Sequence, residues 1–146
     1  MVEAISKRPI RLWVAAIMNI VIGLLSLFLL VFLAASPRVP ETMRPATATI
    51  ALAVATASFL VVASSVALLG KNRWNYLMLV AALAFYGLLI TQNIVALRGS
   101  YAELGQDAGA KLLANVARTG LELVINFWAL LSLKTRMYFN SKVAAP

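Results

Sequence analysis

The sequence predicts an all-α integral membrane protein, with four transmembrane helices in an up-down antiparallel bundle and both termini in the cytoplasm. Two observations support this fold class. Apolar residues make up 62% of the 146 residues and charged residues only 12%, with a mean hydropathy of +0.89, whereas an ordinary soluble domain has about 25% charged residues. The apolar residues also gather in four runs, each long enough to cross a hydrocarbon core of about 30 Å.

The four runs set the expected boundaries of a single four-helix domain over residues 1–146. We expect spans at about 12–35, 47–69, 74–97 and 112–133, with short tails at 1–11 and 134–146. The runs lack the alternation of a transmembrane β-strand, and only helices or closed barrels satisfy the backbone in lipid. The first run is longer than the apolar core of a signal peptide, so we expect it to be retained.

The first two spans differ in the size of their residues. The first is bulky nearly all round, which is typical of lipid contact, and Asn19, Gly23 and Ser26 mark its expected inward face. In the second, Ala, Ser, Thr and Gly supply 15 of the 25 residues from Ala46 to Gly70. Small residues let helix backbones approach in a membrane, so we expect this helix to touch two neighbours or to form a homodimer interface. Gly70 is placed to end the helix as a C-cap.

The distribution of basic residues predicts the orientation of the bundle in the membrane. Eight Lys and Arg residues lie in the two tails and in the turn between the second and third spans, against four in the other two loops. Cytoplasmic loops are enriched in Lys and Arg, so we expect both termini in the cytoplasm. Trp13, Trp74 and Trp128 lie near the corresponding ends of their spans, as interfacial anchors do.

One polar stripe interrupts the fourth span. Its residues recur at spacings of 4, 3, 4 and 4, which places them on one face of an α-helix: Lys111, Asn115, Arg118, Glu122 and Asn126. A central charge that faced lipid would cost about 2.5–3.5 kcal/mol. We therefore expect the stripe to face protein, water or another subunit, and Arg118 to pair with Glu122 four residues later.

Possible partners of the stripe lie at matching depths, counted at about 1.5 Å per residue from the cytoplasmic ends. Three polar layers are expected: Asn19 with Asn126, Tyr86 with Glu122 below Arg118, and Gln92 and Asn93 with Asn115. Such layers fit contacts that fix the register of helices. They leave open a docking face for another protein's helix, or a proton- or cation-responsive role for Glu122. Arg118 argues against a proton carrier, because a neighbouring cation favours the ionised carboxylate.

The composition excludes several kinds of chemistry. With no Cys and no His, the chain lacks a thiol nucleophile, a histidine base and the usual ligands of zinc and haem. Its five acidic residues are too scattered for a calcium-type cage, so we expect neither an enzyme nor a cofactor or metal. The net charge is +8, but the basic residues flank apolar runs, which favours contact with the lipid bilayer and not with nucleic acid.

Four short-looped helices with a basic side and one membrane glutamate are similar in topology to the small multidrug-resistance transporters. In that family the glutamate lies on the first helix, whereas Glu122 lies on the fourth, beside an arginine. The early Arg8–Pro9 and the "KNRW" turn are similar in style to those of small bacterial four-span proteins.

We therefore expect a non-enzymatic protein of the bacterial inner (plasma) membrane that contacts another membrane protein or its own copies. Suitable roles are an accessory or regulatory subunit or a toxin-immunity protein. The alternative is a small dimeric transporter, coupled to cations or protons through Glu122.

Overall fold

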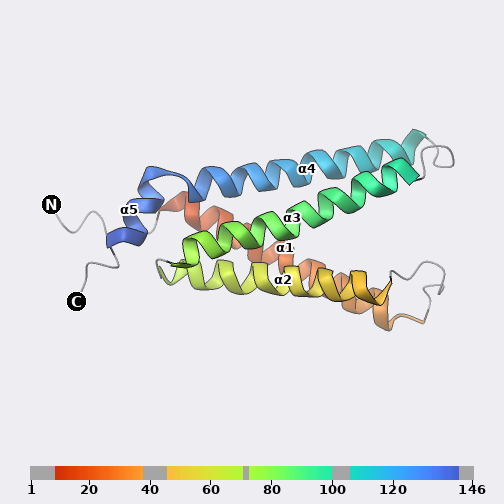
Figure 1. Ribbon diagram of the computed structural model, residues 1–146, viewed down its shortest axis with the longest axis horizontal. Helices are drawn as coiled ribbons and strands as arrows, with labels where there is room; N and C mark the ends of the chain where they lie inside the picture. The colour runs from red at the N-terminus through yellow and green to blue at the C-terminus, as the bar shows by residue number, and fades with distance from the viewer. Residues whose placement is uncertain (1–8, 38–45, 71–72, 100–105, 142–146) are drawn as a thin grey trace.

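The computed structural model describes residues 9–37, 46–70, 73–99 and 106–141. These residues form five helices: α1 (Ile10–Ala35), α2 (Thr47–Leu68), α3 (Arg73–Gly99), α4 (Gln106–Leu130) and α5 (Leu133–Ser141). The four long helices lie side by side, and successive ones run in opposite directions (Figure 1). The helices α1, α2 and α3 begin and end within two residues of the expected spans.

Three helices are long and apolar enough to cross a membrane: α1, α2 and most of α3 (Asn75–Arg98). The helices α4 and α5 reach this apolarity only as one span bent by 53°, so the described residues provide three or four candidate spans. Every long helix also exposes large apolar side chains, such as Phe28, Val62, Val80 and Leu121. Soluble monomers rarely expose so much apolar surface, so the exposure is consistent with lipid surroundings.

The end of the fourth span differs from the prediction. The helix α4 runs from Gln106 to Leu130 instead of over 112–133, and α5 occupies much of the expected C-terminal tail. Ser132 accounts for the break, because its hydroxyl accepts a hydrogen bond from the backbone N–H of Thr135 (3.4 Å) and so caps the new helix. The Thr135 hydroxyl donates in turn to the backbone carbonyl of Ala129 (2.6 Å).

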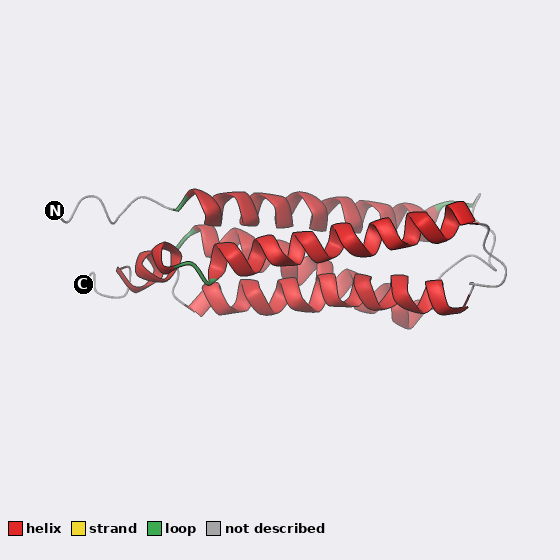
Figure 2. Cartoon of the chain, turned by 90° about the horizontal axis from the view of Figure 1, so that it is seen from above, coloured by secondary structure: helices red, strands yellow, loops and turns green. Residues whose placement is uncertain are grey.

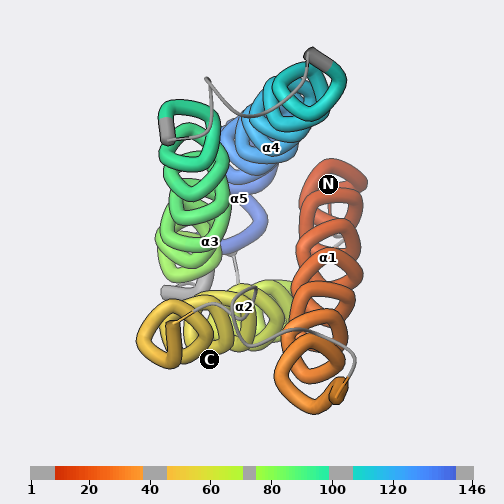
Figure 3. Tube along the Cα trace, turned by 90° about the vertical axis from the view of Figure 1, so that its right-hand side faces the viewer, coloured from red at the N-terminus to blue at the C-terminus, as the bar shows by residue number. Residues whose placement is uncertain are grey.

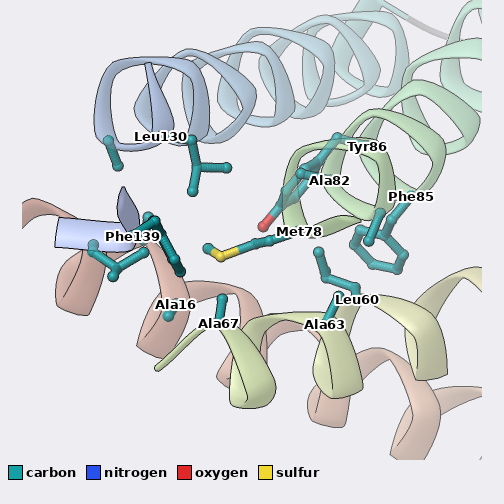
Figure 4. Close-up of a cluster of buried hydrophobic side chains, with 14 of the residues drawn as sticks. Ala16, Leu60, Ala63, Ala67, Met78, Ala82, Phe85, Tyr86, Leu130 and Phe139 are labelled. Carbon is teal, nitrogen blue, oxygen red and sulfur yellow. The ribbon is translucent and has the colours of Figure 1, made fainter. Parts of the chain in front are cut away.

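The short helix α5 folds across one end of the long helices, which we call the α5 end (Figure 2). Its buried residues, Thr135, Tyr138 and Phe139, lie on one helix face. Phe139 lies in the same buried cluster as Leu130 of α4 and Met78 of α3 (Figure 4). A segment expected to be a tail therefore contributes to the core.

The C-cap residue of α2 is Leu69, one residue before the Gly70 that the sequence predicted, and Gly70 follows it directly. Its φ of +79° lies in the left-handed region that favours glycine, and its N–H bonds to the carbonyl of Ala67 (3.0 Å). The missing side chain also makes room for α5, because a Cβ atom at this position would lie 2.7 Å from the hydroxyl oxygen of Tyr138.

The helix α2 packs against both α1 and α3, as its small residues predicted (Figure 3). Gly23 of α1 marks the closest approach. A Cβ atom there would lie 2.6 Å from Cγ2 of Val61 and 3.3 Å from the backbone oxygen of Ala57. A side chain at this position would force Val61 to shift, so the glycine favours the close packing of α1 against α2.

The buried core occupies only the half of the bundle nearer α5. Buried residues extend along α1 no farther than Gly23 and along α3 no farther than Tyr86, while those of α2 begin at Ala57 and those of α4 at Thr119. Toward the opposite end, the pair α1–α2 diverges from the pair α3–α4 (Figures 1 and 3). Among the described residues of these four helices, none in that diverging half is buried.

Candidate functional site

A buried hydrogen-bond network joins three helices at the border of the core. Asn19 of α1 donates from Nδ2 to Oδ1 of Asn126 of α4 (2.7 Å), and Asn126 Nδ2 donates back to Oδ1 of Asn19 (3.0 Å). The Tyr86 hydroxyl of α3 donates to the same Asn19 oxygen (2.8 Å). All three side chains are fully buried. We call these residues the Asn19–Tyr86–Asn126 network.

Tyr86 thus bonds to Asn19, whereas the depth count predicted that it would pair with Glu122. Side chains on a helix point back toward the N-terminus of that helix, and the N-terminus of α3 lies at the α5 end (Figure 1). The long tyrosine side chain therefore places its hydroxyl nearer the α5 end than its Cα atom, level with Asn19. A depth count based on Cα positions could not include this offset.

Arg118 and Glu122 bond to each other along one side of α4. The Nε atom of Arg118 lies 3.0 Å from Oε1 of Glu122. The two side chains differ in exposure, since 72% of the Arg118 side chain is exposed against 13% of the Glu122 side chain. Arg118 is the thirteenth of the 25 residues of α4, so the uncovered guanidinium belongs to the middle of the helix.

Lys111 and Asn115 of the stripe lie farther into the diverging half than Arg118 and are also exposed. At about 100° per residue, Lys111, Asn115 and Arg118 project within roughly 80° of Asn126. Asn126 faces α1, to which it bonds. The stripe is therefore covered at Asn126 and uncovered farther along, where α1 and α4 separate (Figure 3).

The predicted layer of Gln92 and Asn93 with Asn115 does not form within the described residues. Asn93 donates from Nδ2 to the backbone carbonyl of Leu89 in its own helix (2.7 Å). Asn115 lies on the side of α4 that faces α1, whereas Gln92 and Asn93 belong to α3. Equal depth was therefore not sufficient to bring these amides together.

One contact near the α5 end escaped the sequence analysis. The guanidinium carbon of Arg11 of α1 lies 4.2 Å from the ring centroid of Trp128 of α4, a cation–π contact. A basic residue at the start of the first span and a Trp near the end of the last one were the available indications. The contact joins α1 to α4 between the Asn19–Tyr86–Asn126 network and the α5 end, whereas the exposed stripe lies on the other side of the network.

The described residues define a helical protein with three or four candidate membrane-spanning helices. Comparison of the chain with known protein families, curated proteins and solved structures gave no match. Within the described residues, no group of three or more His, Cys, Asp or Glu could hold a metal ion. The candidate functional site is therefore the polar stripe of α4, from the buried Asn126 to the exposed Arg118, Asn115 and Lys111.

Proposed function

We propose that this chain is a small inner-membrane protein of bacterial type that crosses the bilayer four times, with α4 and α5 as a bent last span. Both termini lie on the cytoplasmic side, which is the side on which α1 begins and α5 ends. The excess of basic residues in the tails and the α2–α3 turn supports this orientation. Lys134 and Arg136 of α5 are exposed at this end, where they meet anionic headgroups.

The protein works by binding another membrane-spanning chain along the α4 stripe, as an accessory or regulatory subunit or a toxin-immunity protein. The observation that carries this proposal is the 72% exposed side chain of Arg118 in the middle of α4. A charge that faces lipid is costly within a span, by about 2.5–3.5 kcal/mol at the centre of a spanning helix. A helix of a partner covers the charge and supplies acceptors to its unused N–H groups.

The diverging half of the bundle supports the same proposal. Its described residues form no buried core, although the helices continue for several turns beyond the Asn19–Tyr86–Asn126 network. A partner helix placed between α1 and α4 buries this surface and the stripe together. The two features then have one cause, an interface whose second side belongs to another chain.

Photocrosslinking in native membranes tests this interface. A benzoylphenylalanine at position 115 is expected to form a discrete protein adduct, and one at Val80, on the exposed face of α3, is expected to form none. Replacing both members of the ion pair (Arg118→Leu with Glu122→Leu) should weaken the position-115 adduct about tenfold, because it removes the interhelical bonds without leaving a lone charge. The melting temperature in detergent serves as the folding control. Equal labelling at both positions would contradict the interface.

Transport coupled to cations or protons is the second candidate, and one observation favours it. Glu122 is 13% exposed and uses only Oε1 in its bond with Arg118, at the border between the core and the diverging half. We expect Glu122→Gln to abolish any coupled flux while the Arg118 contact persists, since glutamine retains an acceptor oxygen. Vesicles with a pH-sensitive dye and an imposed Na⁺ or K⁺ gradient measure this. An unchanged proton flux in the variant would rule out coupling through Glu122.

A further inference from the structure

The ion pair on α4 leaves most of its hydrogen-bonding groups unused. A guanidinium carries five N–H donors, and Arg118 directs only its Nε–H to Glu122 within the described residues. Oε2 of Glu122 accepts no hydrogen bond from any described residue. Arg118 and Glu122 are thus electrically neutral as a pair and incomplete as hydrogen-bonding partners.

We propose that the chain covering the stripe is a second copy of this protein, in which Arg118 of each copy bonds to Glu122 of the other. This inference rests on the proposed docking function and specifies its partner. Two copies inserted in the same orientation are related by a two-fold axis along the membrane normal, which places equal residues at equal depth. Arg118 and Glu122 are one turn apart, an offset that the arginine already spans within its own helix.

Charge balance favours a second copy over a foreign helix that carries an acid. Arg118 is already neutralised by Glu122, so an additional carboxylate from a different protein would leave a net negative charge in the membrane. A second copy brings one cation and one anion. The four groups then alternate in sign, and each carboxylate accepts hydrogen bonds from two guanidinium groups.

The residues around Arg118 allow the close approach that such bonds need. Ala110 and Ala114, four residues apart, lie two turns and one turn before it on the same side of α4 and are exposed. Small residues at this spacing let two helix backbones come together in a membrane. Leu121, which is 61% exposed one turn after Arg118, supplies an apolar contact beside the charges. This face of α4 therefore carries small side chains before Arg118 in the sequence and an apolar side chain after it.

Crosslinking in vesicles that contain this chain alone tests the inference, and the absence of native cysteine makes the experiment clean. Ala114→Cys is expected to give a covalent dimer with a short bis-maleimide in phosphatidylethanolamine–phosphatidylglycerol vesicles at high lipid-to-protein ratio. Ala84→Cys, an exposed alanine of α3, is the matched control and should give none. Adding Arg118→Gln should lower the dimer yield about tenfold.

A charge-exchanged variant distinguishes loss of the ion pairs from loss of the fold. Arg118→Glu with Glu122→Arg restores the pair within α4 and the pair across the two-fold axis, so the dimer yield should return to that of Ala114→Cys alone. No dimer in these vesicles, with a persistent position-115 adduct to another protein in native membranes, would overturn the second copy and leave the docking function standing. Absence of both products would overturn both. Equal dimer yields from Ala114→Cys and Ala84→Cys would indicate random collision and also overturn the inference.

Discussion

Replacing Asn19 with leucine is expected to lower the free energy of unfolding by about 2–3 kcal/mol. The change removes three hydrogen bonds, two with Asn126 and one with Tyr86. The Tyr86 hydroxyl and the Asn126 amide then stay buried with too few partners. An interhelical hydrogen bond in a membrane contributes about 0.6–2 kcal/mol, and the unpaired groups add their desolvation cost.

Unfolding in detergent, followed by circular dichroism, measures this effect, and a double-mutant cycle identifies its origin. Asn19→Leu combined with Asn126→Leu should cost less than the sum of the two single changes by about 1 kcal/mol, since the second change removes a group that the first left unpaired. Asn93→Leu is the control, because among the described residues Asn93 bonds only within its own helix. Strict additivity of the two changes would show that the network contributes nothing as a unit.

Replacing Phe139 with alanine is expected to detach α5 from the long helices. Phe139 is 1% exposed in a cluster with Met78 and Leu130, and truncating a buried Phe to Ala costs about 3–5 kcal/mol in protein cores. The loss falls mainly on α5, because the bend at Ser132 separates it from α4 and, besides Phe139, its described residues bury only Thr135 and Tyr138. The long helices keep the Asn19–Tyr86–Asn126 network and should remain folded.

Limited trypsin digestion reports the detachment, since Lys134 and Arg136 both lie in α5. Cleavage after these residues should become about a hundredfold faster in the variant, as expected when local opening is easier by roughly 3 kcal/mol. Asn140→Ala changes an exposed residue of the same helix and should leave the rate unchanged. Equal cleavage in both variants would mean that Phe139 does not anchor α5.

The sequence predicted the elements that depend on apolar length. The helices α1, α2 and α3 follow their apolar runs, and the small residues of α2 placed it between two neighbours. Gly70 follows the end of α2 because glycine suits that left-handed backbone conformation best. The bend before α5 was missed. Ser132 and Thr135 form a helix cap there, but they lie in a run that is apolar on average, so the pattern predicted a continuous helix.

The candidate site was predictable in its helical face and less so in its contacts. The spacing of Arg118 and Glu122 correctly brought them together, because four residues make one helical turn. Depth alone paired Tyr86 with the wrong group, since it ignored the length and tilt of the side chain. The exposure of Arg118 followed from the divergence of the helix pairs, a tertiary feature that no periodicity along a single helix encodes.

The confinement of the core to the α5 end has a consequence for the fluctuations of the native protein. Segments with few buried contacts open locally at low free energy, while well-packed segments open only when the whole domain unfolds. The free chain therefore has a gradient of local stability along its helices, highest at the α5 end and lowest where the pairs separate. Binding of a partner to the less stable half would reduce local opening there, while the α5 end would stay closed with or without the partner.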